Sequence, residues 1–375
     1  MKTKTIFYSV FLVFFVSCNR VSNIVPTIDG NIINIKLETA ERINTSSIFD
    51  SICYLVLDEK DVLLSDVNKI EIVDSLLFIL DLKDQSLYEF DIDGNYLCTI
   101  GRKGQGPGEY VSLSDFAIDD KSNRVVVLDR NARKIISYDF MGNHINEYHI
   151  DMMAMKIGRI GDGWAIYTGG GDFYTSTKED RAYNLFFMND KFEVQGKYFY
   201  YNLDRDDLIH DKVFDYCSQD GTLAYHYSIS DTIYLFNASK GNTKLFVDFK
   251  EHNMPLDKVT KDTFREYINR SQYALISSIC YSSDYMYINY TLKRRSHFIL
   301  YNMKSNECYN VSYLMNDMGK ELLALPLPLK VINGQALFLK QANDLLFEND
   351  AEYMYIGDKK ITKDSNPLLM IGHLK

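Results

Sequence analysis

Hydrophobic residues along this chain fall into short runs that are rich in β-branched and aromatic residues, the types that favour a pleated, half-buried sheet surface. Six polar turns each stand directly before such a run, and the intervals between them are 48, 40, 58, 64 and 49 residues. A period of this length predicts a radial repeat with one four-stranded sheet per unit. The turns are centred near Asp74-Ser75, Ser122-Asn123, Asp162-Gly163, Asp220-Gly221, Asp284 and Asn333-Gly334.

Two neighbouring units match each other at an offset of 48 residues. Leu80-Asp81 corresponds to Leu128-Asp129, and Gly94-Asn95 corresponds to Gly142-Asn143. Glycine and asparagine supply the positive φ values that a tight hairpin turn requires. The repeat therefore predicts an all-β fold, a six-bladed β-propeller with four-stranded antiparallel blades.

The sixth unit is short of outer strands, whereas two strand-like runs, 31–37 and 51–57, precede the first unit. We expect the N-terminal stretch to supply the outermost strand of the last blade. Closing the ring in this way removes exposed sheet edges, which invite aggregation. Residues 31–375 are predicted to form a single propeller domain.

The segment 256–270 has a different periodicity. Val259, Phe264, Tyr267 and Ile268 recur at helical spacing, and charged residues occupy the other positions. This pattern predicts a short helical insertion between the fourth and fifth units.

The N-terminus has the pattern of an export signal. Lys2 and Lys4 precede an apolar run over 6–16, and Ser17-Cys18 follows where that run ends. This resembles the lipobox of bacterial lipoproteins, which implies a signal peptide over 1–18, a lipidated Cys18 and a tether over 19–30. An ordinary secretory signal cut elsewhere is the alternative. We expect an exported protein, facing the periplasm or on the outer membrane, that contacts the membrane through its lipid anchor only.

The net charge of the chain is −10. Nonspecific nucleic-acid binding depends on neutralising phosphates with Lys and Arg. The composition therefore argues against a nucleic-acid partner.

A glycine-rich segment, Gly-Arg-Lys-Gly-Gln-Gly-Pro-Gly-Glu-Tyr over 101–110, follows the first Gly-Asn hairpin. The passage 77–110 resembles the six-bladed β-propeller lipoproteins related to NHL-repeat and TolB-like propellers, many of them from gut-type Gram-negative anaerobes. The specific likeness covers the first two units. It implies the fold and an envelope location, and it assigns no reaction.

The glycine-rich segment is not a phosphate-binding loop, because no Gly-Lys-Ser/Thr follows and no helix begins after it. We interpret it as a crossing from an outer strand to the next inner strand, where glycines permit tight turning. If the crossing has a function, Arg102 and Glu109 should point toward the mouth of the central channel.

Loops between the second and third strands of each blade should share a face with these crossings. Several carry cations, and together they could form a basic rim for an anionic ligand or an acidic partner. The alternative is a set of ordinary solvated loops. The predicted ligand-binding residues are Lys83, Arg102, Lys103, Glu109, Arg130, Arg133 and Arg294.

No local motif predicts catalysis, a metal or a cofactor. Asp81 and Asp129 occupy equivalent strand ends, where a carboxylate usually caps a turn. The histidines form no metal-binding pattern, and no Gly-x-Ser-x-Gly elbow is present. We expect a noncatalytic binding or scaffold protein of the cell envelope that recognises a protein, peptide or glycan. The alternative is a hydrolase, lactonase or lyase with a site at the channel mouth.

Overall fold

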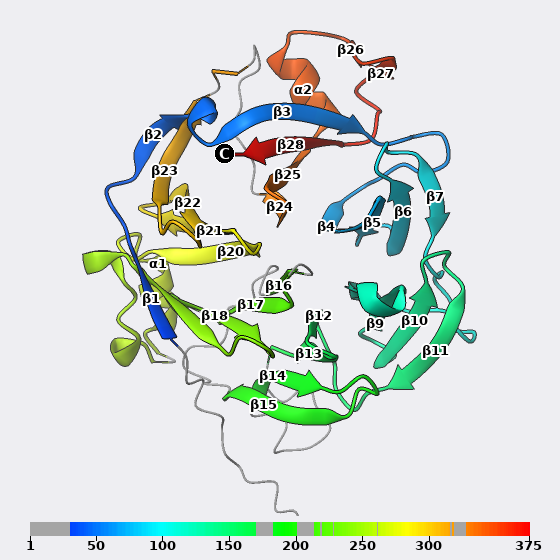
Figure 1. The fold of residues 1–375 in the computed structure, drawn as a ribbon, viewed down its shortest axis with the longest axis horizontal. Helices are drawn as coiled ribbons and strands as arrows, with labels where there is room; N and C mark the ends of the chain where they lie inside the picture. The colour runs from blue at the N-terminus through cyan, green and yellow to red at the C-terminus, as the bar shows by residue number, and fades with distance from the viewer. Residues whose placement is uncertain are drawn as a thin grey trace, which may run out of the picture.

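The computed structural model places most of the chain in one ring of β-sheets (Figure 1). The signal segment, Cys18 and the tether lie outside the described residues. The structure describes residues 31–169, 183–200, 214–217, 220–227, 229–260, 262–315, 317–318 and 328–375.

Six sheets surround a central axis, and each has its first strand innermost. The six polar turns predicted from the sequence are the hairpins that join the first and second strands of the six blades. The prediction of a six-bladed, four-stranded antiparallel propeller is thus confirmed. Blade 1 consists of β4 (Val67–Val73), β5 (Leu76–Asp81), β6 (Ser86–Asp91) and β7 (Tyr96–Thr99). Blade 2 consists of β8 (Leu113–Asp119), β9 (Arg124–Asp129), β10 (Lys134–Asp139) and β11 (His144–His149). Blade 3 consists of β12 (Lys156–Ile160), β13 (Gly163–Tyr167), β14 (Tyr183–Met188) and β15 (Val194–Tyr200).

The last three blades include strands from the N-terminus. Short 3₁₀ turns, η1 (Thr45–Ser47), η2 (Asp120–Ser122) and η4 (Lys250–His252), interrupt the connections. Blade 4 consists of β16 (Phe214–Cys217), β17 (Thr222–His226), β18 (Thr232–Asn237), β19 (Thr243–Asp248) and β1 (Asn31–Lys36). Blade 5 consists of β20 (Leu275–Tyr281), β21 (Tyr285–Leu292), β22 (Arg295–Asn302), β23 (Cys308–Met315) and β2 (Glu41–Asn44). Blade 6 consists of β24 (Pro328–Ile332), β25 (Gln335–Lys340), β28 (Leu368–Leu374) and β3 (Phe49–Val56).

The ring closes as predicted, with an N-terminal strand on the outside of the last blade. Strand β3 runs antiparallel to β28, and Cys53 pairs with Ile371 in the register. Phe49 anchors the start of β3, since it is buried and its ring meets that of Phe338 edge-on at 6.1 Å. Two ends of the chain thus share one sheet.

The other N-terminal strands add a feature that the sequence did not predict. Strand β1 pairs in parallel with β19, and β2 pairs in parallel with β23. Blades 4 and 5 therefore have five strands each. The added strands occupy outer edges that would otherwise present unpaired backbone groups.

The predicted helical insertion is present between blades 4 and 5, but the regular helix is shorter than 256–270. It consists of the 3₁₀ turn η5 (Leu256–Lys258) and the helix α1 (Phe264–Asn269). Val259 and Phe264 are buried in a small cluster with Met254 and Ile229. The apolar positions that suggested a helix are thus anchors that hold the insertion to blade 4.

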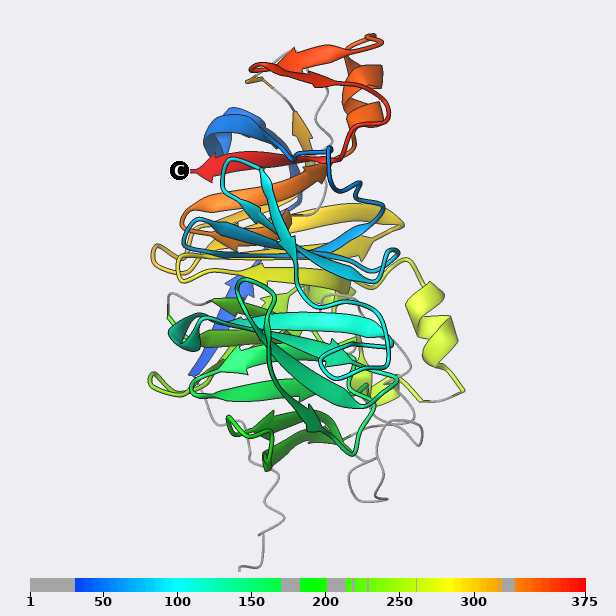
Figure 2. The ribbon, with the colours of Figure 1, turned by 90° about the vertical axis from the view of Figure 1, so that its right-hand side faces the viewer.

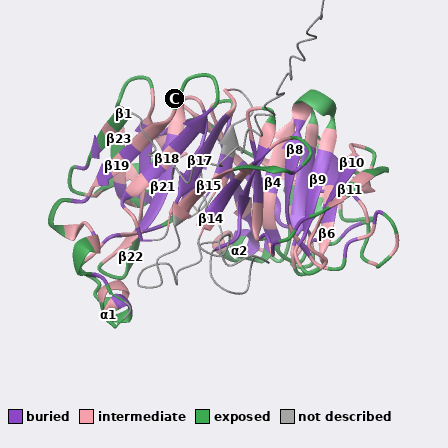
Figure 3. Ribbon diagram, turned by 90° about the horizontal axis from the view of Figure 1, so that it is seen from below, coloured by how far each residue is buried: buried purple, intermediate pink, exposed green. Residues whose placement is uncertain are grey.

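A second insertion, in blade 6, was not predicted. Helix α2 (Ala342–Glu348) and the hairpin of β26 (Met354–Ile356) and β27 (Lys359–Ile361) separate β25 from β28. Figure 2 shows it projecting from the ring, and Figure 3 shows that the buried residues concentrate in the strands. The insertion explains why the sixth unit appeared to lack its outer strands.

Asp231 ties the first insertion to blade 4. Its Oδ2 atom accepts hydrogen bonds from Asn253 Nδ2 at 2.9 Å and from the backbone N–H of Met254 at 3.0 Å. Burial raises the pKa of Asp231 to about 6, although both hydrogen bonds act in the opposite direction. A buried carboxylate without a cation is a source of pH dependence.

We expect the folded protein to lose stability as pH rises from about 4 to 6 because of this group. Its folded pKa lies above the unfolded value of about 3.9, so the native state binds more protons in this window. The resulting loss in the free energy of unfolding amounts to up to about 3 kcal/mol at neutral pH. Asp231→Asn should flatten the dependence, because one amide oxygen can accept both hydrogen bonds. Urea denaturation at several pH values measures this, and an unchanged pH slope in the variant would contradict it.

Candidate functional site

The innermost strands bring a chain of charged side chains into the central channel. Lys69 Nζ lies 3.1 Å from Asp115 Oδ1. Lys330 Nζ lies 2.6 Å from Asp215 Oδ1 and 3.1 Å from Glu71 Oε2. These residues belong to β4, β8, β16 and β24, so the ion pairs span the channel between four blades.

Backbone groups of the remaining two blades complete this channel network. The N–H of Ile157 in β12 donates to Asp115 Oδ2 at 2.8 Å. The N–H of Tyr281 in β20 donates to Asp215 Oδ2 at 2.6 Å. The channel network therefore joins all six blades across the axis.

Lys330 is the centre of the channel network and is only 3% exposed. Burial opposes its charge, yet the neighbouring carboxylates of Asp215 and Glu71 hold its pKa above the ordinary value. The two cavities beside it measure about 40 Å³ each. Such volumes suit ordered water and are too small for an organic ligand.

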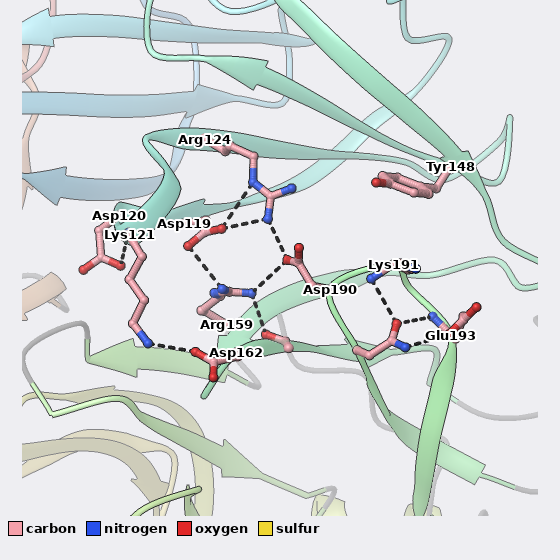
Figure 4. A network of polar contacts seen from close by, with 12 residues as sticks. Asp119, Asp120, Lys121, Arg124, Tyr148, Arg159, Asp162, Asp190, Lys191 and Glu193 are labelled. Atoms are coloured by element: carbon pink, nitrogen blue, oxygen red, sulfur yellow. Dashed lines mark hydrogen bonds and ion pairs between the residues drawn. The ribbon is translucent and has the colours of Figure 1, made fainter.

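A second polar network joins blades 2 and 3 (Figure 4). Arg124 and Arg159 both contact the buried Asp119, at 2.8 and 3.2 Å, and both reach the more exposed Asp190. The guanidinium of Arg159 also lies 4.5 Å from the ring centre of Trp164. Since cations and carboxylates balance, this network is best explained as a bond between blades.

The glycine-rich segment is closed on itself. Arg102 Nε donates to Glu109 Oε1 at 2.6 Å, and the N–H of Gly106 donates to Glu109 Oε2 at 2.8 Å. The hydrogen bond from the Gly106 N–H contributes most, and the bond from Arg102 comes next; together they hold the pKa of the Glu109 carboxyl below its ordinary value. A Cβ on Gly101, whose φ is +66°, would lie 2.5 Å from the Tyr138 hydroxyl, so the segment packs tightly against blade 2. Arg102 and Glu109 thus pair with each other.

Asp81 and Asp129 both cap turns. Asp81 is fully buried and accepts backbone hydrogen bonds from Ser65, Asp66, Lys83 and Asp84, at 2.6 to 3.0 Å. Asp129 accepts three in the same way. Each carboxylate joins a blade crossing to the loop between the second and third strands, so these two sets of loops do share one face.

The remaining predicted residues lie in four different loops of the ring. Lys83 and Lys103 are exposed, whereas Arg130 and Arg133 are half-buried at the β9–β10 turn. Arg294 is exposed at the β21–β22 turn, three blades away from that turn around the ring. None of the seven predicted residues is among the described residues that line the two channel cavities.

Sequence reasoning missed a groove on the outer side of blades 4 and 5. This blade 4/5 groove has a volume of about 630 Å³. The link between β1 and β2 forms one wall, and the β21–β22 turn forms part of the rim. Its lining includes Glu38, Lys250, His252, Tyr290, Arg295 and His297. The signal that could have found it is the basic run Lys293-Arg294-Arg295, of which only Arg294 is among the predicted ligand-binding residues.

The inner wall of the blade 4/5 groove is aromatic and ordered. The rings of Tyr290 and His297 stack at 5.0 Å, and the Tyr290 hydroxyl donates to Asn310 Oδ1 at 2.7 Å. Burial lowers the pKa of His297 and the Arg295 charge acts in the same direction, against the backbone hydrogen bond with Leu292. The lowered pKa favours the neutral imidazole at pH 7.

A family model described as a domain of unknown function, DUF4934, matches residues 30–373. The chain belongs to the DUF4934 family. No curated protein matches it. Among the described residues, this DUF4934 chain has no helix long and apolar enough to cross a membrane. Within the same residues, no three His, Cys, Asp or Glu side chains cluster as a metal site would require.

Two solved structures share the propeller fold. One is a candidate exported protein from Bacteroides fragilis, 18% identical, with a TM-score of 0.74 over 92% of this chain and 100% of the other. The other is a member of the DUF4221 family from Bacteroides vulgatus, 12% identical, with a TM-score of 0.54 over 87% and 97%. At these identities the likeness concerns the fold alone. The resemblance to NHL-repeat and TolB-like lipoproteins stays a prediction.

Proposed function

We propose that this chain is an exported, lipid-anchored propeller of the cell envelope that binds a ligand in the blade 4/5 groove without transforming it. One contrast carries the proposal. The groove measures about 630 Å³, whereas the channel cavities measure about 40 Å³ each. Pockets that hold small organic ligands usually measure about 300 to 1,000 Å³.

The state of the channel residues supports binding over catalysis. A general acid or base needs a titratable group within reach of a substrate. Asp115 and Asp215 are buried and already accept bonds from lysine and from the backbone. A hydrolase, lactonase or lyase at the channel mouth has less support for this reason.

Export is supported by the apolar run before Cys18. The name of the Bacteroides fragilis relative, a candidate exported protein, agrees with this. Asn19-Arg20 lacks the acidic run that resembles a surface-export signal in related bacteria, which favours the periplasmic side. The ligand would then be a protein, peptide or glycan of the envelope.

Site-specific photocrosslinking in the native envelope tests the proposal. A photoreactive residue at Glu38, on the wall of the blade 4/5 groove, should give a defined adduct of the full-length chain. The same residue at Lys121, an exposed position of blade 2, serves as the matched control. Adducts of equal yield at both positions, or at neither, would contradict binding in the groove. Cys18→Ser should move the chain to the soluble fraction, and retention in the membrane fraction would contradict the lipid anchor.

A further inference from the structure

Three cations line the blade 4/5 groove, and a fourth, Arg294, lies beside it. Within the part of the chain that the structure describes, Lys250, Lys293, Arg294 and Arg295 form no ion pair, and all four are exposed. Lys293 lies between the groove and a smaller hollow of about 260 Å³, which Arg294 also lines. On a protein with a net charge of −10, such a cluster attracts anions locally.

Three of these cations occupy strained backbone positions. Lys293 and Arg294 form the two-residue turn between the paired Leu292 and Arg295, and their φ angles are 52° and 60°. Lys250 has a φ of 58°. Turns of this kind favour Asn-Gly, because other residues are disfavoured in the left-handed region. Gln85 and Arg133, in the equivalent loops of blades 1 and 2, also have positive φ angles, but among the described residues only Lys293 and Arg294 are two consecutive non-glycine residues in this conformation.

The rest of the lining is suited to hydroxyl groups. Three carboxylates, Glu38, Asp248 and Glu251, line the same groove, and Glu251 lies 3.7 Å from His252 Nε2. They can accept hydrogen bonds from hydroxyls, but they would repel a ligand charged along its whole length. Ser312 lies among them. His297 hydrogen-bonds to the backbone of Leu292, and its buried Nδ1 is not accessible from the solvent-filled part of the groove. The ligand that fits carries a localised anion and several hydroxyls.

An extended peptide is a poorer fit at this place. Peptides commonly bind by adding a strand to an open sheet edge. Strands β19 and β23 are paired with β1 and β2, which form the outer edges of blades 4 and 5. The groove is lined by the link between β1 and β2 and not by a strand edge, so it recognises its ligand mainly through side chains.

We infer that the blade 4/5 groove binds an acidic saccharide, whose carboxylate contacts the cations Lys250, Lys293 and Arg295 and whose hydroxyls contact Glu38 and Asp248. The inference rests on the proposed function and specifies its ligand. Arg and Lys bind carboxylates through charge-assisted hydrogen bonds, which weaken when the anion is neutralised.

Calorimetric titration of the purified full-length lipoprotein tests the inference. The probes are a hyaluronan disaccharide, which carries one carboxylate, its methyl ester, tetragalacturonic acid, which carries four, and a tetraglutamate peptide. The hyaluronan disaccharide should bind more tightly than the other probes, and esterification should weaken its binding about tenfold or more. The double variant Lys293→Asn/Arg294→Gly should weaken binding by a similar factor and raise the melting temperature, because Asn-Gly suits the turn. Lys121→Asn is the control and should bind as the native chain does.

Several results would overturn the inference. Tighter binding of the peptide would assign the groove to acidic peptides, and equal binding of acid and ester would remove the role of the anion. Binding that is unchanged in the double variant would remove the role of the strained turn. If no saccharide binds while the photoadduct at Glu38 persists, the ligand class is wrong and the proposed function stands. If both fail, the groove is not the ligand site.

Discussion

Lys330→Met is expected to lower the free energy of unfolding by about 3–5 kcal/mol, the loss usual when one partner of a buried ion pair is removed. Methionine fills a similar volume but leaves Asp215 without its cation in a nearly closed channel, and leaves Glu71 with only Lys69, whose Nζ is 3.9 Å away. The measurement is equilibrium urea denaturation of the full-length chain. A loss below about 1 kcal/mol, as at exposed pairs, would show that the channel network contributes little.

Lys340→Met provides a matched control. Lys340 is also buried, but it contacts a single carboxylate, Glu348, at 2.6 Å in the blade 6 insertion. The loss should be smaller there, because Glu348 is partly exposed and can turn toward solvent. A triple variant, Lys330→Met with Glu71→Gln and Asp215→Asn, should recover part of the stability, because it leaves no uncompensated charge.

Phe49→Ala is expected to lower the free energy of unfolding by about 3–5 kcal/mol, because it removes a buried aromatic ring from the strand that closes the ring of blades. Phe49 packs on Phe338 and lies against Gly372, where a Cβ would come within 2.6 Å of the Phe49 ring. The cavity would open at the junction of β3, β25 and β28.

Two spectroscopic probes can locate the effect of Phe49→Ala. Trp164, the single tryptophan, is buried in blade 3, opposite blade 6 in the ring. If blade 6 opens first, the circular dichroism signal should change at lower urea than the Trp164 fluorescence. Asp50→Ala, a change at the next, exposed position of β3, is the control and should have little effect. A variant as stable as the native chain would contradict the role of β3 as the closing strand.

Much of the fold could be predicted because its signals are local. Gly94 and Gly142 have φ angles of +82° and +79° and mark the same hairpin in two blades, and the six first hairpins recur at intervals of 40 to 64 residues. The closing strand followed from counting the strands of blade 6. Strands β1 and β2 could not be assigned in this way, because their partners lie about 210 and 270 residues away and pair through backbone groups, which leave little trace in side-chain type.

The site was harder to predict because its residues come from different blades that the fold brings together. Lys330 and Asp215 read as ordinary polar positions of two strands, and the sequence does not show that both strands are innermost and face each other. Arg102 and Arg294 stood out as cations in loops, yet Arg102 pairs with Glu109 while Arg294 has no ion pair among the described residues. Only the arrangement of blades distinguishes these two cases.

The pairing of β3 with β28 also determines when the protein can finish folding. Cys53 and Ile371 are partners, yet 318 residues of the chain separate them, so the first of these strands is synthesised long before the second. Blades 1 to 3 each consist of contiguous strands and can form as the chain emerges. Contacts this distant along the chain slow folding, and the waiting edge of β3 is open to other chains meanwhile. A chain that ends before Leu368 lacks β28, so β3 has no partner and the ring of blades stays open. Pairing of the seven residues of β28 is therefore the step that closes the propeller.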